Sequence, residues 1–86
     1  MNENLKRLIE LADGQSALAN ALRDERNPIT QAHVWKWVNT TKLGIPAEFV
    51  IKASEAVNWQ VTPHELRPDL YPHPQDGLPE HLREVA

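Results

Sequence analysis

Residues 15–39, QSALANALRDERNPITQAHVWKWVN, have the apolar spacing of two short helices joined by a connection. In the first segment Leu18 and Leu22 lie four residues apart with small alanines around them, so a second helix can cross closely. In the second segment Val34 and Trp37 belong to one inward stripe. The stretch therefore predicts two packed helices, which form either a helix-turn-helix or a plain hairpin of a small bundle.

The second helix of this pair carries polar residues at its beginning and along its outer side. Thr30 is placed to cap it, because a threonine hydroxyl can accept a hydrogen bond from a free backbone N–H group near the helix start. Gln31 follows, and glutamine can bond bidentately to adenine in the major groove of DNA. These residues predict a DNA-recognition helix over about 30–40.

The candidate DNA contacts lie at helix starts, on the outer side of the second helix, or beside it. Gln31 and Lys36 are candidates for base contact, and Ala32 could touch a thymine methyl group. For each polar candidate the plain alternative is a solvated side chain, and for His33 a surface histidine is the simpler reading. The whole predicted set is Gln15, Ser16, Arg26, Thr30, Gln31, Ala32, His33, Trp35, Lys36, Asn39 and Lys42.

The size and composition of the chain exclude several classes of protein. Its 86 residues predict one small domain whose core is only modestly stabilising, so that oligomerisation would help. The sequence has no cysteine and therefore no disulfide framework, and no apolar run approaches the roughly 20 residues of a membrane span. No signal peptide is apparent, and we expect a cytoplasmic, nucleoid-associated protein without membrane contact.

The formal net charge of −3 is distributed unevenly along the chain. Residues 1–60 carry seven basic and seven acidic side chains, whereas residues 61–86 carry two basic and five acidic ones. Residues 26–42 contain three basic side chains and no acidic one, which predicts a small positive face around the recognition helix. Because so few phosphates could be neutralised, we expect binding to double-stranded operator DNA as a homodimer.

Three further helices are predicted outside this pair. The first covers about 2–11 and is ended by Asp13–Gly14, and the fourth has Pro46 in its first turn. A short fifth helix covers 63–66, because Thr62 and Glu65 have the spacing of a capping box. No strand-like alternation of useful length occurs, so the predicted fold class is all-α. Residues 1–72 form the predicted domain, and residues 73–86 form a flexible, acidic, proline-containing tail.

The remaining aromatic and titratable residues indicate structure rather than catalysis. Trp37 is expected in the core, and Trp59 is expected in the core or in a dimer seam. The four histidines lack cysteine partners and metal-binding spacing, and no catalytic constellation or glycine-rich phosphate loop is present. We therefore expect neither an enzyme nor a cofactor.

Three segments in this order, QSALANAL…ITQAHVWKWVN, IPAEFVIKASEAV and VTPHELRPDLYP, resemble the Cro-like, YdaS-type repressor family over about 2–72. The most specific markers are IPAE at 45–48 and ELRPDLYP at 65–72. The resemblance implies a compact five-helix, lambda-repressor-like helix-turn-helix domain. It also implies a phage- or prophage-encoded transcription repressor, sometimes catalogued as an antitoxin, that binds operator DNA as a dimer.

Two features depart from the pattern of that family. The connection at 23–29 is longer than the usual glycine-containing turn, so it could shift the entry angle of the recognition helix or add a loop that touches phosphate. Trp35 replaces a small polar residue, and it either stacks on sugar or a thymine methyl group or packs against its neighbours.

The alternative function is an antitoxin-type interaction module in which DNA binding is secondary. In that case the acidic tail would fold on a protein partner, such as a toxin or another regulatory protein. Helix four and residues 58–71 are the predicted surface for self-association, because they carry apolar residues that the helical pair does not need.

Overall fold

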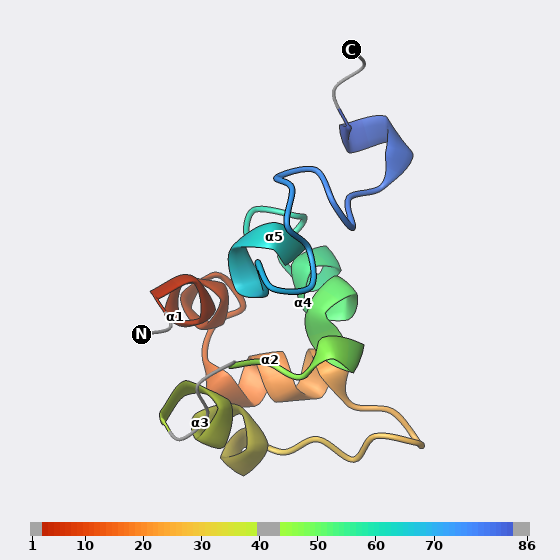
Figure 1. Cartoon of the computed structure of the whole chain (residues 1–86). Coiled ribbons are helices and arrows are strands. Elements are labelled where there is room, and N and C mark those ends of the chain that lie inside the picture. The colour runs from red at the N-terminus through yellow and green to blue at the C-terminus, as the bar shows by residue number, and fades with distance from the viewer. Residues whose placement is uncertain (1–2, 40–43, 84–86) are drawn as a thin grey trace.

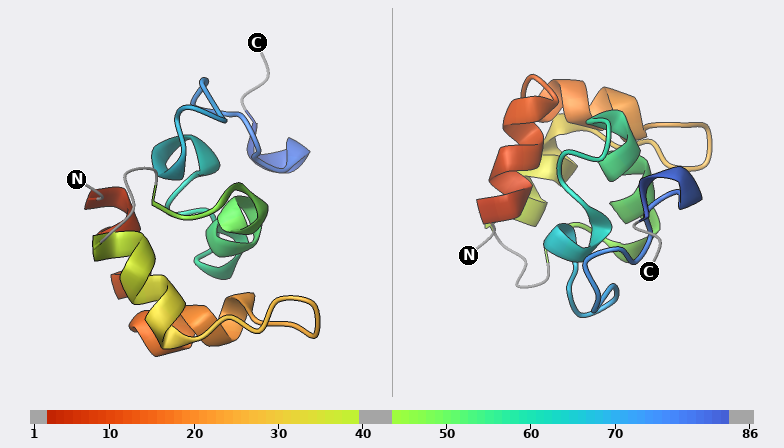
Figure 2. Two further views of the ribbon diagram at one scale, coloured as in Figure 1. Left: turned by 60° about the horizontal axis from the view of Figure 1, so that its bottom comes forward. Right: turned by 90° about the horizontal axis from the view of Figure 1, so that it is seen from above.

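The computed structural model describes residues 3–39 and 44–83. Its elements are α1 (Glu3–Leu11), α2 (Gln15–Leu22), α3 (Gln31–Asn39), the short helical turn η1 (Ala47–Phe49), α4 (Val50–Ala56), α5 (Pro63–Leu66) and the short helical turn η2 (Glu80–Leu82). All five predicted helices are present and these residues form no strand, which confirms the all-α prediction. The pair α2 and α3 lies at one end of the molecule and the C-terminal segment at the other (Figures 1 and 2). In the described part of the chain, no helix has the length and apolar character needed to cross a membrane.

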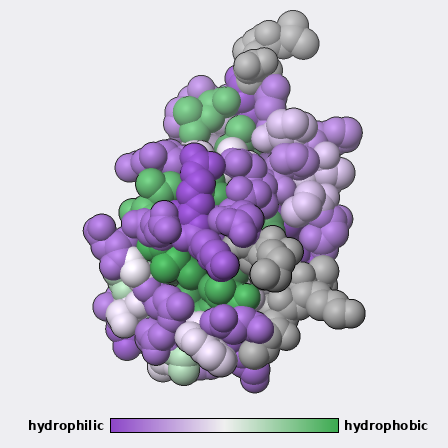
Figure 3. Space-filling model, turned by 90° about the vertical axis from the view of Figure 1, so that its left-hand side faces the viewer, coloured by the Kyte–Doolittle hydropathy of each residue, from purple (hydrophilic) through white to green (hydrophobic). Residues whose placement is uncertain are grey.

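Helix α1 packs one side onto the core and ends where the sequence predicts. Leu5 and Leu8 are buried. Gly14 has a φ of 112°, and its N–H donates to the carbonyl of Ile9 at 2.8 Å. Asp13, the residue before it, has the left-handed φ of 72° that this closure requires, and Gly14 accepts its own positive φ because it has no Cβ. From the side of α1, apolar surface is visible in patches between polar side chains (Figure 3).

The inward stripes of α2 and α3 form the centre of the core. Leu18, Leu22 and Val34 are fully buried, and Trp37 is 6% exposed. The Trp37 ring stacks on Phe49, with ring centroids 5.5 Å apart and planes inclined by 28°. Offset aromatic pairs of this kind add to the stabilisation that burial gives. The predictions of a packed helical pair and of a core Trp37 are therefore confirmed.

The entry to α4 differs from the prediction at Pro46. Pro46 has extended backbone, with φ −60° and ψ 148°, and stands as the N-cap of η1. The chain first makes the tighter turn η1, and the α-helix begins only at Val50. The prediction of Pro46 inside the first turn of the fourth helix was therefore wrong, because Pro46 precedes η1 and α4 begins four residues after it. The φ that the proline ring fixes suits both an N-cap and a first helical turn, but the ψ of Pro46 belongs to the extended region.

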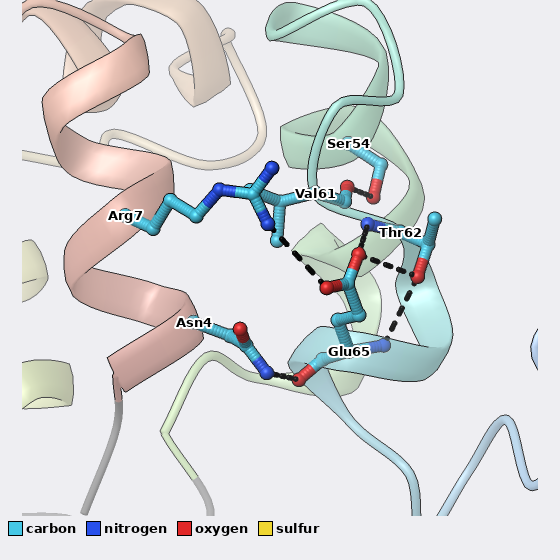
Figure 4. A network of polar contacts seen from close by, with 6 residues as sticks. All are labelled: Asn4, Arg7, Ser54, Val61, Thr62 and Glu65. Carbon is cyan, nitrogen blue, oxygen red and sulfur yellow. Dashed lines mark hydrogen bonds and ion pairs between the residues drawn. The ribbon is translucent and has the colours of Figure 1, made fainter.

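Helix α5 is fixed by the predicted capping box (Figure 4). The Thr62 hydroxyl accepts from the Glu65 N–H at 3.2 Å, and Glu65 Oε1 accepts from the Thr62 N–H at 3.1 Å. On the other side of Glu65, Asn4 Nδ2 donates to its carbonyl at 3.0 Å and Arg7 Nη1 lies 3.5 Å from Oε2. Glu65 therefore starts α5 and also ties it to α1.

The family marker at 65–72 includes a buried arginine. Arg67 Nη1 donates to the carbonyl of Ile45 at 2.8 Å, and its Nε and Nη2 donate to the two carboxylate oxygens of Asp69 at 2.9 and 2.8 Å. The hydrogen bonds between the two side chains lower the pKa of Asp69 and raise that of Arg67. Bidentate pairs are strong and geometrically specific, so this arginine joins the end of α5 to the chain before η1.

The segment after α5 lies against α4 and α5. His64 Nδ1 donates to the carbonyl of Tyr71 at 2.7 Å, because a carbonyl can only accept. Gly77 has a φ of 80°, and a Cβ there would lie 2.8 Å from Pro63 Cγ and 2.9 Å from Ile51 Cδ1. The flexible tail at 73–86 and the domain boundary after Pro72 stay predictions, and residues 84–86 lie outside the described part.

Candidate nucleic-acid interface

Helix α3 has one face in the core and one face in solvent. Its buried residues are Val34 and Trp37. The outer face consists of exposed residues at helical spacing, namely Gln31, Ala32, Trp35, Lys36 and Asn39. Each of these predicted site residues is therefore accessible to a ligand that approaches α3 from the side opposite the core.

The first residues of α2 and α3 are joined through their side chains. Gln31 Nε2 donates to Gln15 Oε1. This contact orients the Gln31 amide and leaves its Oε1 and the second Nε2 hydrogen for another partner. Adenine requires this combination of an acceptor and a donor in the major groove. Ser16, the next residue of α2, is exposed at the same end of that helix.

The start of α3 is capped in a different way from the prediction. The Thr30 N–H donates to Nδ1 of His33 at 3.0 Å, and the Thr30 hydroxyl lies 3.0 Å from the same nitrogen. Because an N–H group can only donate, Nδ1 is the acceptor and the hydroxyl also donates to it. The prediction that the Thr30 hydroxyl accepts from a backbone N–H was therefore wrong. With Nδ1 as the acceptor, Nε2 is the ring nitrogen of His33 that remains to donate.

The long connection between α2 and α3 is fixed by one aspartate. Asp24 Oδ1 accepts from the backbone N–H groups of Arg26 at 2.9 Å and Asn27 at 2.8 Å, which closes an Asx-type turn. Its Oδ2 lies 3.1 Å from Lys52 Nζ, which also donates to the carbonyl of Leu22 at 3.2 Å. The hydrogen bonds from Lys52 and then from Asn27 lower the pKa of Asp24.

This arrangement gives the predicted contact Arg26 a defined place. Its backbone N–H is held by Asp24, and its side chain is exposed on the projecting loop. In Figures 1 and 2 the loop extends beyond the C-terminal end of α2, at the end of the molecule that carries α3. The positioning residues Asp24 and Lys52 were not among the predicted set. Periodicity gave no signal for them, because they belong to different elements far apart in the sequence.

The C-terminal end of α3 holds the last predicted contacts. Asn39 Nδ2 donates to the carbonyl of Trp35 at 2.9 Å, so this side chain satisfies a carbonyl of its own helix. A DNA contact of Asn39, one of the predicted set, would use its remaining amide hydrogen. Lys42 lies outside the described residues, as does Thr40.

The described residues form a small all-helical protein in which α2 and α3 make a helix-turn-helix-like pair. Residues 5–75 match the model of the family described as bacterial toxin YdaS, and the chain therefore belongs to that family. The resemblance found at 2–72 is confirmed, and the functional class that it supports is that of toxin–antitoxin-related prophage proteins. Comparisons with curated proteins and with solved structures found no match.

Proposed function

We propose that the protein is a sequence-specific DNA-binding transcription repressor that inserts α3 into the major groove of operator DNA. The observation that carries the proposal is the Gln15–Gln31 hydrogen bond at the start of an exposed helix face. It orients an adenine-compatible amide at the helical end that helix-turn-helix proteins direct toward base edges. The protein then acts by binding rather than by catalysis, without a cofactor, and at the nucleoid.

Phosphate contacts in this proposal come from the ends of α2 and α3 and from the loop. Ser16 lies near the start of α2, and His33 Nε2 can donate near the start of α3. Arg26, Lys36 and Lys42 supply the positive charge, and 26–42 holds no acidic residue. Because this charge is small, the proposal includes two copies of the chain on a two-fold site.

The test uses duplexes that the full chain selects from a random pool, with affinity followed by fluorescence anisotropy at low and moderate salt. Gln31→Ala should lower the affinity for the selected duplex by about 5- to 150-fold and relax one base preference. Gln60→Ala is the matched control, because this exposed glutamine lies after α4. Lys42→Ala should weaken all duplexes similarly and reduce the salt slope by about one. Selection of no sequence, or unchanged affinity of Gln31→Ala, would contradict the proposal.

The second candidate is an antitoxin-type module that binds a toxin or another regulatory protein. The family is described as bacterial toxin YdaS, which supports a toxin–antitoxin context for this candidate. The C-terminal segment lies at the opposite end of the molecule from α3 (Figure 1), so a protein bound there would leave α3 accessible. Deletion of 80–86 retains the Gly77 contact with α4 and α5. It should weaken partner binding and leave DNA binding intact, and loss of DNA binding on deletion would oppose this division of roles.

A further inference from the structure

Trp35 is the most exposed of the large apolar side chains in the described residues. Half of it, 50%, is accessible, compared with 44% for Leu70 and 43% for Leu82. It stands one helical turn after Gln31 on the outer face of α3, with Lys36 next to it. A large aromatic surface therefore lies in the middle of the face that we propose enters DNA.

The packing of α3 keeps Trp35 in solvent in the isolated chain. Val34 is fully buried and Trp37 stacks on Phe49, so rotation of the helix to bury Trp35 would remove these side chains from the core. The carbonyl of Trp35 is also bonded to Asn39, which holds the last turn in helical geometry. The backbone of Trp35 thus keeps a fixed position relative to Gln31 on the outer face.

The chemistry of the outer face favours base edges rather than phosphates as its contact. Gln31 and Ala32 are uncharged, and α3 contains one lysine, Lys36, and no arginine. In the major groove the apolar group that distinguishes one base from the others is the C5-methyl of thymine. We propose that Trp35 is a specificity-determining residue that packs on a thymine methyl group next to the base contacted by Gln31. This inference rests on the proposed function.

The contact should be visible as a dependence on single methyl groups. In the duplex selected by the full chain, each thymine is replaced in turn by deoxyuridine, which removes only the methyl group. At one or two positions the replacement should lower the affinity of the unmodified chain about fourfold, the effect of burying one methyl-sized group. For Trp35→Ala the same replacements should not change the affinity. Trp35→Phe should retain part of the dependence on the methyl group.

Leu82→Ala is the matched control, because it truncates an apolar side chain of similar exposure in η2, within the C-terminal segment. It should keep the full methyl dependence, and thermal unfolding should show that both alanine variants remain folded. The inference is overturned if no thymine replacement affects the unmodified chain, or if Trp35→Ala keeps the same dependence. Those results would leave the repressor proposal standing, whereas failure to select any duplex would remove the proposed function itself.

Discussion

The α5 end of the molecule and the outer face of α3 use polar side chains in opposite ways. At α5, Thr62, Glu65 and Arg67 bond to other parts of the chain, and these bonds connect α5 with α1 and with the segment before η1. On α3, Gln31 bonds to Gln15 and Asn39 bonds to the carbonyl of Trp35, while the outer face stays exposed. The polar residues at the α5 end therefore stabilise the fold, whereas the exposed polar residues of α3 form a surface that is available for binding.

The largest expected effect separates the core beneath α3 from its outer face. Leu18→Ala should lower the free energy of unfolding by about 2–5 kcal/mol, because it leaves a cavity at a fully buried position. Trp35→Ala should change that free energy by less than about 0.5 kcal/mol. Chemical denaturation of both variants measures the difference. Equal losses would mean that Trp35 belongs to the core, and the comparison of the two faces would fail.

A smaller effect is expected where the C-terminal segment meets α4 and α5. Gly77→Ala adds a Cβ within 3 Å of Pro63 and Ile51 and also strains a positive φ, so it should cost about 1–3 kcal/mol. Gly14→Ala is the matched control, because its φ is also positive but no atom lies within 4 Å of the added Cβ. Thermal unfolding should show the larger loss for Gly77→Ala. If the two losses are equal, the close contact of the segment is not part of the folded domain.

The two helix caps should respond differently to loss of a threonine hydroxyl. Thr62→Ala removes an acceptor for a backbone N–H and should cost about 1 kcal/mol. Thr30→Ala removes a hydroxyl that bonds to the His33 ring, while the Thr30 N–H keeps its acceptor. Its cost should be below about 0.5 kcal/mol. A reversed order in denaturant titrations would show that Thr30, rather than His33, caps α3.

Periodicity and capping patterns were sufficient to predict the helices and the exposure of the α3 face. Local rules apply within one or two turns, and Val34, Trp37 and Gln31 are placed by such rules. The same rules were wrong at Thr30, because the imidazole three residues later supplies an acceptor that the pattern does not reveal. They also gave no indication of Lys52 on Asp24, since that contact depends on how α4 packs on α2. Long-range polar pairs of this kind require the folded structure.

The smallest effect concerns acid stability at the α5 end. The hydrogen bonds from Arg67 lower the folded-state pKa of Asp69 below its ordinary value of 3.8. A carboxylate with a depressed pKa contributes stability that is present above the unfolded-state pKa and is lost as pH falls through the folded-state pKa. Unfolding of the unmodified chain should therefore become easier below about pH 4, and Asp69→Asn should weaken this dependence. Glu80→Gln, an exposed carboxylate in η2, should leave the profile unchanged. An unaltered acid profile in Asp69→Asn would show that the Arg67 pair does not hold the α5 end together.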